Sequence, residues 1–184
     1  PFLLRRTKNA ILKELPAKVE SDVALAMSDA QREIYTRIVA EVREEVRAAY
    51  QEQTRAQAGI VALAALTRLR QACVSPALLG HDPKTASPKI EYLADTLEEL
   101  CAEGHSVLVF SQFVKALEQI QSGLKKAGIQ PLRLDGGTPT PKRKAAVEQF
   151  QNSDRPEVFL ISLKAGGVGL NLTRASYVIH VDPW

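Results

Sequence analysis

The residues with the clearest potential for chemistry are three glycines in the segment 162–171. Gly166, Gly167 and Gly169 follow the apolar run 158–161, which is rich in β-propensity residues. A glycine-rich turn after a strand lets the phosphates of a ligand approach backbone N–H groups, because no Cβ stands in the way. The spacing matches neither GxxxxGK[ST] nor GxGxxG. The pattern therefore predicts an anion-binding turn without identifying a nucleotide site.

Two further polar turns follow apolar runs in the same way. Ser111-Gln112 follows 107–110, and the segment 135–138, Asp-Gly-Gly-Thr, follows 131–134. If these runs are parallel strands, their carboxyl ends share one edge of a sheet, so the turns would form one phosphate-tracking surface. Cationic residues nearby in the sequence are Lys115, Arg133, Lys142, Arg143 and Lys164. The alternative is that the glycines only make tight turns and that the charges on helix 141–150 face solvent.

No catalytic constellation is visible in the sequence. The three histidines and the strand-end carboxylates have no partner at a recognisable catalytic spacing, and we expect His180, inside a strand, to be packed in the core. Cys73 and Cys101 lie outside any CxxC or Cys/His spacing, so we expect buried, reduced thiols. The sequence therefore predicts neither a catalytic residue nor a metal site.

Alternating elements are predicted to position the polar turns. Strands are expected at 107–110, 131–134, 158–161 and 177–181, with helices at 113–127 and 140–150 between them. Strands that alternate with helices indicate right-handed crossovers and a parallel sheet flanked by helices, an α/β fold. A helix over 88–102, with Ser87 as its N-cap, precedes this pattern.

The N-terminal part is predicted to be helical. Ser28 and Gln31 fit a capping box at the start of an amphipathic helix that extends to about residue 53. A second helix over 60–74 ends before Pro76, and the two helices are expected to pack as a hairpin. The chain thus divides into a connector (1–27), a helical subdomain (28–79) and an α/β lobe (80–184). It starts without Met and stops directly after a strand, so we expect an excised fragment.

Composition sets broad limits on these interpretations. The 184 residues are 45% hydrophobic and 24% charged, which is ordinary for a globular protein. No apolar run approaches the roughly 20 residues that a membrane span needs. The net charge of +3 and the pI near 9.0 are compatible with a polyanionic partner but do not by themselves indicate one.

Several blocks resemble the Swi/Snf family of DNA-dependent ATPases, in the family's order and over nearly the whole chain. The similar blocks are PFLLRRTKNAILKELPAKVE, LTRLRQACVSPALL, SVLVFSQF (motif IV), LRLDGGTPTPKR (the motif IVa region) and VFLISLKAGGVGLNLTRASYVIHVDPW (motif V and the strand after it). Two departures are Gly137, where the family often has Ser, and Val74-Ser75, where it often has Asn-His. The resemblance implies the C-terminal RecA-like lobe of a double-stranded-DNA translocase, with the helical subdomain as the family's protrusion.

The resemblance also implies roles for individual residues. The positions that would face the DNA backbone, or support that face, are Ser111, Gln112, Gly136, Thr138, Arg143, Lys164, Gly166 and Gly167. Gly169 and Asn171 would lie toward the nucleotide. The full-length protein would use ATP and Mg²⁺, with Mg²⁺ held mainly by a first lobe that this sequence lacks.

Partners and activity follow from the same resemblance. We expect the DNA backbone, the N-terminal RecA-like lobe and a protein partner on the helical subdomain as partners, and no membrane. The sequence contains no Walker motif and ends before motif VI, so the chain alone should be inactive as an ATPase. Localisation would be cytoplasmic and nucleoid-associated in a bacterium, or nuclear in a eukaryote. A non-catalytic docking module on residues 28–75 is the alternative; a Rossmann-type enzyme ranks lower, because the glycine fingerprint is missing.

Overall fold

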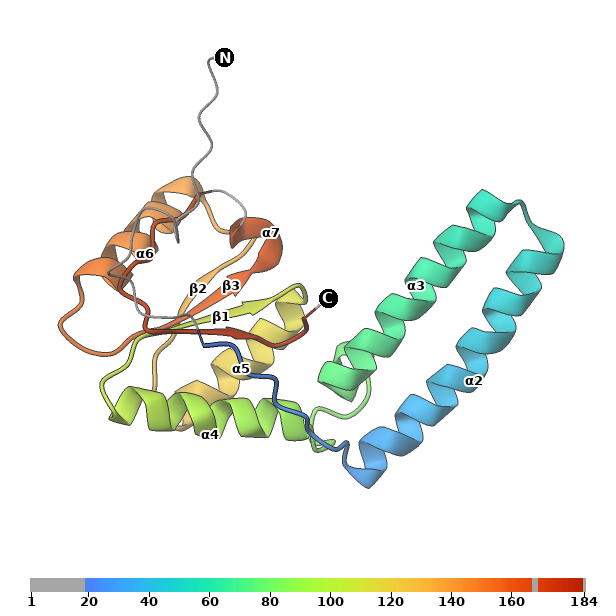
Figure 1. Cartoon of the computed structure of the whole chain (residues 1–184), viewed down its shortest axis with the longest axis horizontal. Helices are drawn as coiled ribbons and strands as arrows, with labels where there is room; N and C mark the ends of the chain where they lie inside the picture. The colour runs from blue at the N-terminus through green and yellow to red at the C-terminus, as the bar shows by residue number, and fades with distance from the viewer. Residues whose placement is uncertain (1–18, 167–168, 184) are drawn as a thin grey trace, which may run out of the picture.

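The computed structural model describes residues 19–166 and 169–183 of the chain. An α/β lobe carries helices on both faces of a four-stranded sheet, and a two-helix hairpin projects beside it (Figure 1). The predicted α/β class with a helical N-terminal part is confirmed. Of the expected connector (1–27), residues 19–27 form neither helix nor strand, and residues 1–18 lie outside the described part of the chain.

The hairpin consists of α2 (Asp29–Glu52) and α3 (Arg55–Val74). Ser28 caps α2 as predicted, since its hydroxyl accepts a hydrogen bond from the Gln31 amide at 3.2 Å. The reciprocal half of the predicted capping box is wrong. The Gln31 side chain, 2% exposed, instead donates to the Ala72 carbonyl of α3 at 2.8 Å. This buried bond ties the start of one helix to the end of the other.

The second helix starts earlier than predicted, at Arg55 and not near residue 60. Thr54 and Gln57 form a full capping box there, which satisfies amide groups at the helix start. After α3 the chain makes a short 3₁₀ helix, η1 (Pro76–Leu79). Ile38, Val42 and two alanines of α3 form the small core between the helices.

The lobe has a parallel sheet in the order β2-β3-β1-β4. Its elements are α4 (Pro88–Ala102), β1 (Val107–Ser111), α5 (Val114–Lys126), β2 (Leu132–Leu134), α6 (Thr140–Asn152), β3 (Val158–Ser162), α7 (Leu163–Gly166) and β4 (Tyr177–His180). Each predicted strand and helix of the lobe is present, with ends shifted by one or two residues. The glycine-rich segment begins with α7, a single helical turn that the sequence did not predict.

Side chains alternate between the two faces of the sheet, so the lobe has two hydrophobic layers. Val109 and Leu160 pack with α4 and α5 on one face. Phe159 and Ile161 pack with Phe150 of α6 on the other. β1 and β3 are the central strands and are almost entirely buried, as their continuous apolar sequences require.

The edge strand β4 departs from expectation. His180 is exposed and stacks on Phe110 with ring centroids 5.5 Å apart, so its predicted place in the core is wrong. Val178 of the same strand is 54% exposed. The apolar sequence of β4 therefore reflects strand propensity and pairing with β1 more than burial.

Two smaller expectations also change. Ser87 precedes α4 as predicted, but its hydroxyl donates to the Val74 carbonyl at 2.6 Å and makes no capping bond. Cys73 and Cys101 are free but only half-buried, and desolvation raises the pKa of both thiols. Of the helices in the described residues, none is long and apolar enough to cross a membrane.

Candidate nucleic-acid interface

The three polar turns lie on one edge of the sheet. β1, β2 and β3 are parallel neighbours, and Ser111 at the end of β1 is in register with Ser162 at the end of β3. Leu134 at the end of β2 is in register with Ile161. Each turn therefore leaves the sheet at its carboxyl edge, as the sequence predicted. This edge points toward the hairpin (Figure 1).

The first turn combines a buried residue with an accessible one. Ser111 is 0% exposed, and its hydroxyl accepts a hydrogen bond from the Phe113 amide at 3.0 Å. Its buried position therefore suits a residue that supports the carboxyl edge of the sheet without contacting a ligand. Gln112 is half-buried, and its side-chain nitrogen Nε2 is fully buried without a hydrogen-bond partner among the described residues. An orphaned buried donor costs about 1–3 kcal/mol unless something satisfies it.

The second turn is built around Asp135. Its carboxylate accepts hydrogen bonds from the Gly137 amide at 2.9 Å and from Arg133 Nε at 2.9 Å. Burial acts to raise the pKa of this carboxyl, but Arg133 and the Gly137 amide outweigh burial and lower the pKa below its ordinary value. Thr138 Oγ1 accepts a hydrogen bond from the Asp135 amide at 3.0 Å. Gly136 and Gly137 are exposed at the tip.

The third turn is α7 with the residues after it. Arg143 of α6 donates to the Ala165 carbonyl at 3.4 Å, which joins the second crossover to this turn. Lys164 is exposed. A Cβ added to Gly166 would lie 2.8 Å from a ring carbon of Phe110, so any larger residue here would have to displace that ring. Gly167 lies outside the described residues.

The two residues predicted to lie toward the nucleotide come after α7 in the chain. Gly169 has φ +58°, in the left-handed region that glycine tolerates best, and both Gly169 and Asn171 are exposed. The described part of the chain contains no group of three or more His, Cys, Asp or Glu side chains that could hold a metal ion.

Asp182 makes contacts at the carboxyl edge of the sheet that the sequence did not predict. Its carboxylate is almost fully buried and accepts the Gln112 backbone N–H at 3.1 Å. Arg70 of α3 approaches the same carboxylate at 3.7 Å and donates to the Asp182 carbonyl at 3.3 Å. The Arg70 guanidinium also lies over the Phe113 ring, 5.7 Å from its centroid. The hairpin is thereby anchored to the first turn. Because 112 residues separate Arg70 from Asp182, no local pattern could have paired them.

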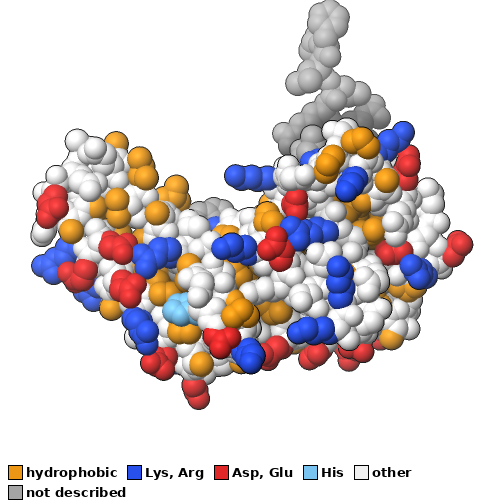
Figure 2. Space-filling view, turned by 180° about the vertical axis from the view of Figure 1, so that it is seen from behind, with side chains coloured by type: hydrophobic (Ala, Val, Ile, Leu, Met, Phe, Trp, Pro, Cys, Tyr) orange, Lys and Arg blue, Asp and Glu red, His pale blue; other side chains and the backbone are white. Residues whose placement is uncertain are grey.

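A hollow of about 400 Å³ opens beside this anchor. Thr67 of α3 forms one wall, and Gln112, Phe113, Leu163 and Lys164 form the others. Two predicted site residues from different turns, Gln112 and Lys164, thus meet a residue of the hairpin that sequence reasoning missed. Seen from behind, the surface dips between the hairpin and the lobe, with Lys and Arg side chains on both sides of the dip (Figure 2).

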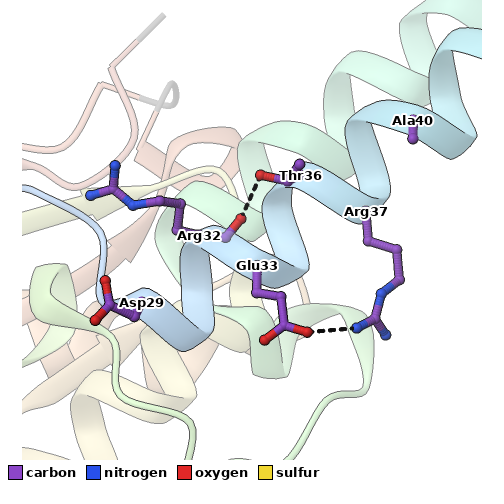
Figure 3. Close-up of a pocket in the computed structure, with 6 residues that line it drawn as sticks. All are labelled: Asp29, Arg32, Glu33, Thr36, Arg37 and Ala40. Atoms are coloured by element: carbon purple, nitrogen blue, oxygen red, sulfur yellow. Dashed lines mark hydrogen bonds and ion pairs between the residues drawn. The ribbon is translucent and has the colours of Figure 1, made fainter.

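A larger hollow, about 620 Å³, lies elsewhere and has a different character. All six of its lining residues belong to α2 (Figure 3). Two of them, Glu33 and Arg37, form an ion pair at 3.2 Å, and Thr36 donates to the Arg32 carbonyl at 2.9 Å. One face of a single helix does not enclose a ligand, so we assign no site to this hollow.

Comparison with known proteins identifies the family. Residues 88–184 match the family described as "Helicase conserved C-terminal domain", and residues 1–78 match the "SNF2-related domain". The chain is 34% identical to the "Putative ATP-dependent helicase/translocase YwqA" of Bacillus subtilis, over all of this chain and 20% of that protein. It is 33% identical to an "Uncharacterized ATP-dependent helicase" of Mycoplasma pneumoniae, over all of this chain and 17% of that protein. The chain thus spans about a fifth of the length of these relatives.

Solved structures show the same relationship. The Sulfolobus solfataricus SWI2/SNF2 ATPase core domain superposes with a TM-score of 0.82 at 31% identity, over 100% of this chain and 38% of that one. The same core in complex with double-stranded DNA superposes with a TM-score of 0.79 at 28% identity, over 100% of this chain and 39% of that one. The parallel sheet, the hairpin and the order of the motifs agree with these matches, and the chain therefore belongs to the SNF2 (Swi/Snf) family of ATP-dependent helicases and translocases, as part of its RecA-like C-terminal domain.

Proposed function

We propose that this chain supplies DNA-backbone contacts and one side of the ATP site in a motor that moves along double-stranded DNA. The observation that carries the proposal is the convergence of three polar turns on the carboxyl edge of one parallel sheet. The exposed Gly136 backbone and the exposed Lys164 ammonium are suited to phosphate groups, which are the same at every base pair. Contacts of this kind would make binding dependent on salt and nearly independent of sequence.

A nucleotide would fit only partly against these residues. Gly169 offers an exposed backbone without a side chain, and Asn171 an exposed carboxamide, which suit a phosphate and a sugar hydroxyl. The described residues contain no group of three or more His, Cys, Asp or Glu side chains that could hold a metal ion, and the proposal assigns the Mg²⁺ ligands to the N-terminal lobe. ATP would supply the free energy for movement, and this chain would bind and orient one side of it.

The resemblance to a structure solved with DNA supports the choice of partner. That structure is a relative bound to double-stranded DNA, and by analogy the same polymer is proposed here. The N-terminal RecA-like lobe is the second proposed partner. The reason is that this chain is proposed to provide only one side of the DNA site and one side of the ATP site.

Fluorescence anisotropy with labelled duplex DNA would test the first part of the proposal. Two duplexes of unrelated sequence should bind with equal affinity, and the logarithm of the binding constant should fall linearly with the logarithm of salt concentration. No binding to either duplex at low salt would refute the DNA-contact role.

ATP hydrolysis would test the second part. The chain joined to its natural neighbouring segments should hydrolyse ATP faster with duplex DNA than without it. Gly169→Val should abolish the response while the protein stays folded, because a β-branched residue is strained at φ +58°. Gly169→Asn is the matched control, since Asn tolerates that conformation. Equal DNA stimulation in wild type and Gly169→Val would remove this turn from the mechanism.

A docking module remains the second candidate, and one observation favours it. Ile60, Leu63 and Leu66 of α3 are 70%, 59% and 49% exposed on one side of the helix. Exposed apolar groups of this kind often mark protein contacts. A pure docking module would show no DNA stimulation in the hydrolysis assay, so that assay separates the two candidates.

A further inference from the structure

The segment 169–176 carries the two residues proposed to lie toward the nucleotide, and it has no regular secondary structure. Between α7 and β4 it forms neither helix nor strand. Gly169 and Asn171 are exposed on it, whereas Leu170 and Leu172 are half-buried against the hydrophobic layer between the sheet and α6. A segment without the hydrogen bonds of a helix or sheet keeps one position only if other groups hold it.

Arg174 joins this segment to the C-terminal end of α6. Its two terminal guanidinium nitrogens donate to the Phe150 carbonyl at 2.9 Å and to the Arg155 carbonyl at 2.7 Å. Phe150 is among the last four residues of α6, whose carbonyls have no partner within the helix. Residues 149–152, all of them described, include no Lys or Arg. Arg174, which is 24 residues after Phe150, thus supplies the cation that a helix C-terminus favours.

Gln151 adds a second set of bonds between the same two elements. Its side-chain oxygen accepts the Arg174 backbone N–H at 3.2 Å, and its Nε2 group donates to the Thr173 hydroxyl at 3.1 Å. Helix α6 is itself fixed to the sheet, since Phe150 is 0% exposed and packs on Phe159 with ring centroids 5.4 Å apart. The bonds from Arg174 and Gln151 therefore fix residues 173–174 relative to the sheet.

The same helix also holds the start of the glycine-rich segment. Arg143, near the beginning of α6, donates to the Ala165 carbonyl of α7 at 3.4 Å, and the two helices lie beside each other (Figure 1). The stretch of chain that contains Gly169 and Asn171 therefore begins and ends on α6.

We propose that Arg174 is a positioning residue for the ATP site, because its bonds to the C-terminal end of α6 hold Gly169 and Asn171 in place. The inference rests on the proposed function, in which these two residues lie against ATP, and it names a residue on which that contact depends. Arg174 is half-buried and both of its terminal nitrogens are engaged, so it acts through the segment and does not touch the nucleotide. The planar guanidinium is needed, since a lysine ammonium is a point charge without the fork that spans two carbonyls.

Hydrogen exchange followed by mass spectrometry tests the positioning directly, in the chain joined to its natural neighbouring segments. The Arg174 and Ala175 amides are hydrogen-bonded in the folded protein. Arg174→Met removes both bonds of the side chain but keeps a long apolar stem. Peptides that cover residues 174–176 should then exchange roughly tenfold faster than in wild type, whereas those of β3 should not change.

Arg155→Met is the matched control. It removes the same charge close to the same helix end, but the Arg155 carbonyl that accepts from Arg174 belongs to the backbone and remains. The Arg155 side chain is 79% exposed, so its loss should cost little stability. Exchange at residues 174–176 should stay at the wild-type rate.

ATP hydrolysis by the same proteins tests the consequence for the nucleotide. Arg174→Met should raise the KM for ATP by roughly tenfold with a smaller change in kcat, because the segment must then be ordered on binding. Arg174→Lys should restore only part of the loss. Asn171→Ala should also raise KM, and adding Arg174→Met to it should have little further effect, because both changes remove the same contact. Affinity for duplex DNA should stay at the wild-type value, since the first and second turns keep their bonds.

The outcomes separate this inference from the proposed function. Unchanged exchange in Arg174→Met would refute the inference, and so would a KM equal to that of Arg155→Met or additive effects of Arg174→Met and Asn171→Ala. If Arg174→Met does not fold, Gln151→Ala removes the bonds to residues 173–174 and should raise KM in the same direction; a wild-type KM there would refute the inference. If wild type neither binds duplex DNA nor responds to it, the proposed DNA role fails, while a higher KM for ATP in Arg174→Met would still support Arg174 as a positioning residue.

Discussion

Gly166 offers the sharpest test of the packing beneath the candidate interface. A Cβ built on this residue would lie 2.8 Å from Phe110 Cε1 and 3.4 Å from Ile161 Cγ2. Ordinary carbon contacts are about 3.5–4.0 Å, so Gly166→Ala would force the Phe110 ring to move by up to about 1 Å. Ile161 is 0% exposed and has no room to yield, whereas Phe110 is half-buried and stacked on His180.

The expected magnitude follows from two opposing terms. Overpacking of this kind costs about 1–3 kcal/mol. Replacing glycine by alanine recovers about 0.4–1 kcal/mol by restricting the unfolded chain. We therefore expect Gly166→Ala to lower the free energy of unfolding by about 1 kcal/mol and Tm by about 2–4 °C.

Gly59→Ala is the matched control for thermal unfolding followed by circular dichroism. Gly59 lies within α3, and a Cβ there meets nothing within 4 Å. Alanine should therefore stabilise the helix by about 0.5–1 kcal/mol. Phe110→Leu in the Gly166→Ala background should cost less than in wild type, because the smaller side chain relieves the clash. If Gly166→Ala is as stable as Gly59→Ala, the close approach is not a constraint and the reasoning is wrong.

Three further expectations concern other parts of the molecule. Arg70→Met should lower the free energy of unfolding in urea by about 2 kcal/mol, because the buried Asp182 carboxylate loses a charged partner. The lowered pKa of Asp135 means that its contribution to stability is complete above the unfolded pKa and is lost as pH falls through the folded one; the Tm advantage of wild type over Asp135→Asn should therefore shrink on acidification below about pH 4. The raised pKa of Cys73 and Cys101 predicts slow alkylation by iodoacetamide near neutral pH until the chain is unfolded.

Each of these has an outcome that contradicts it. Arg70→Met and Asp182→Asn should not be additive, so additive costs in urea would show that the two groups act independently. A pH-independent Tm difference for Asp135→Asn would mean that its carboxyl titrates alike in the folded and unfolded chains. Equal alkylation rates in native and unfolded protein would show that burial does not protect the thiols.

Short-range patterns predicted the elements of the fold well. β1 and β3 come from continuous apolar runs. This composition is expected of central parallel strands, because both of their faces are buried. Strands that alternate with helices are joined by right-handed crossovers and are therefore parallel. The carboxyl ends of parallel strands lie at one edge of the sheet, so the three polar turns share that edge. For the same reason, most of the predicted site residues lie on that edge in the structure, although their contacts with DNA and nucleotide remain predictions.

Local patterns failed where a side chain had two partners to choose between. Gln31 fits a capping box in sequence, yet its amide bonds the Ala72 carbonyl of α3, because an unpaired carbonyl inside the hairpin would cost more than an exposed helix amide that water can satisfy. Ser87 similarly bonds Val74 and leaves its own helix uncapped. His180 has apolar neighbours in the sequence, as a core residue would, but it lies on the edge strand β4.

The sequence by itself determined the class of fold, the family and the edge on which the polar turns would gather, because hydrophobic period, glycine placement and motif order are local properties of the chain. Only the tertiary structure decided that Arg70 and Asp182 would anchor the hairpin to the first turn, and that Thr67 would close a hollow with Gln112 and Lys164. These groups are far apart along the chain and belong to different elements. Their meeting depends on how the hairpin packs against the lobe, which no local spacing encodes.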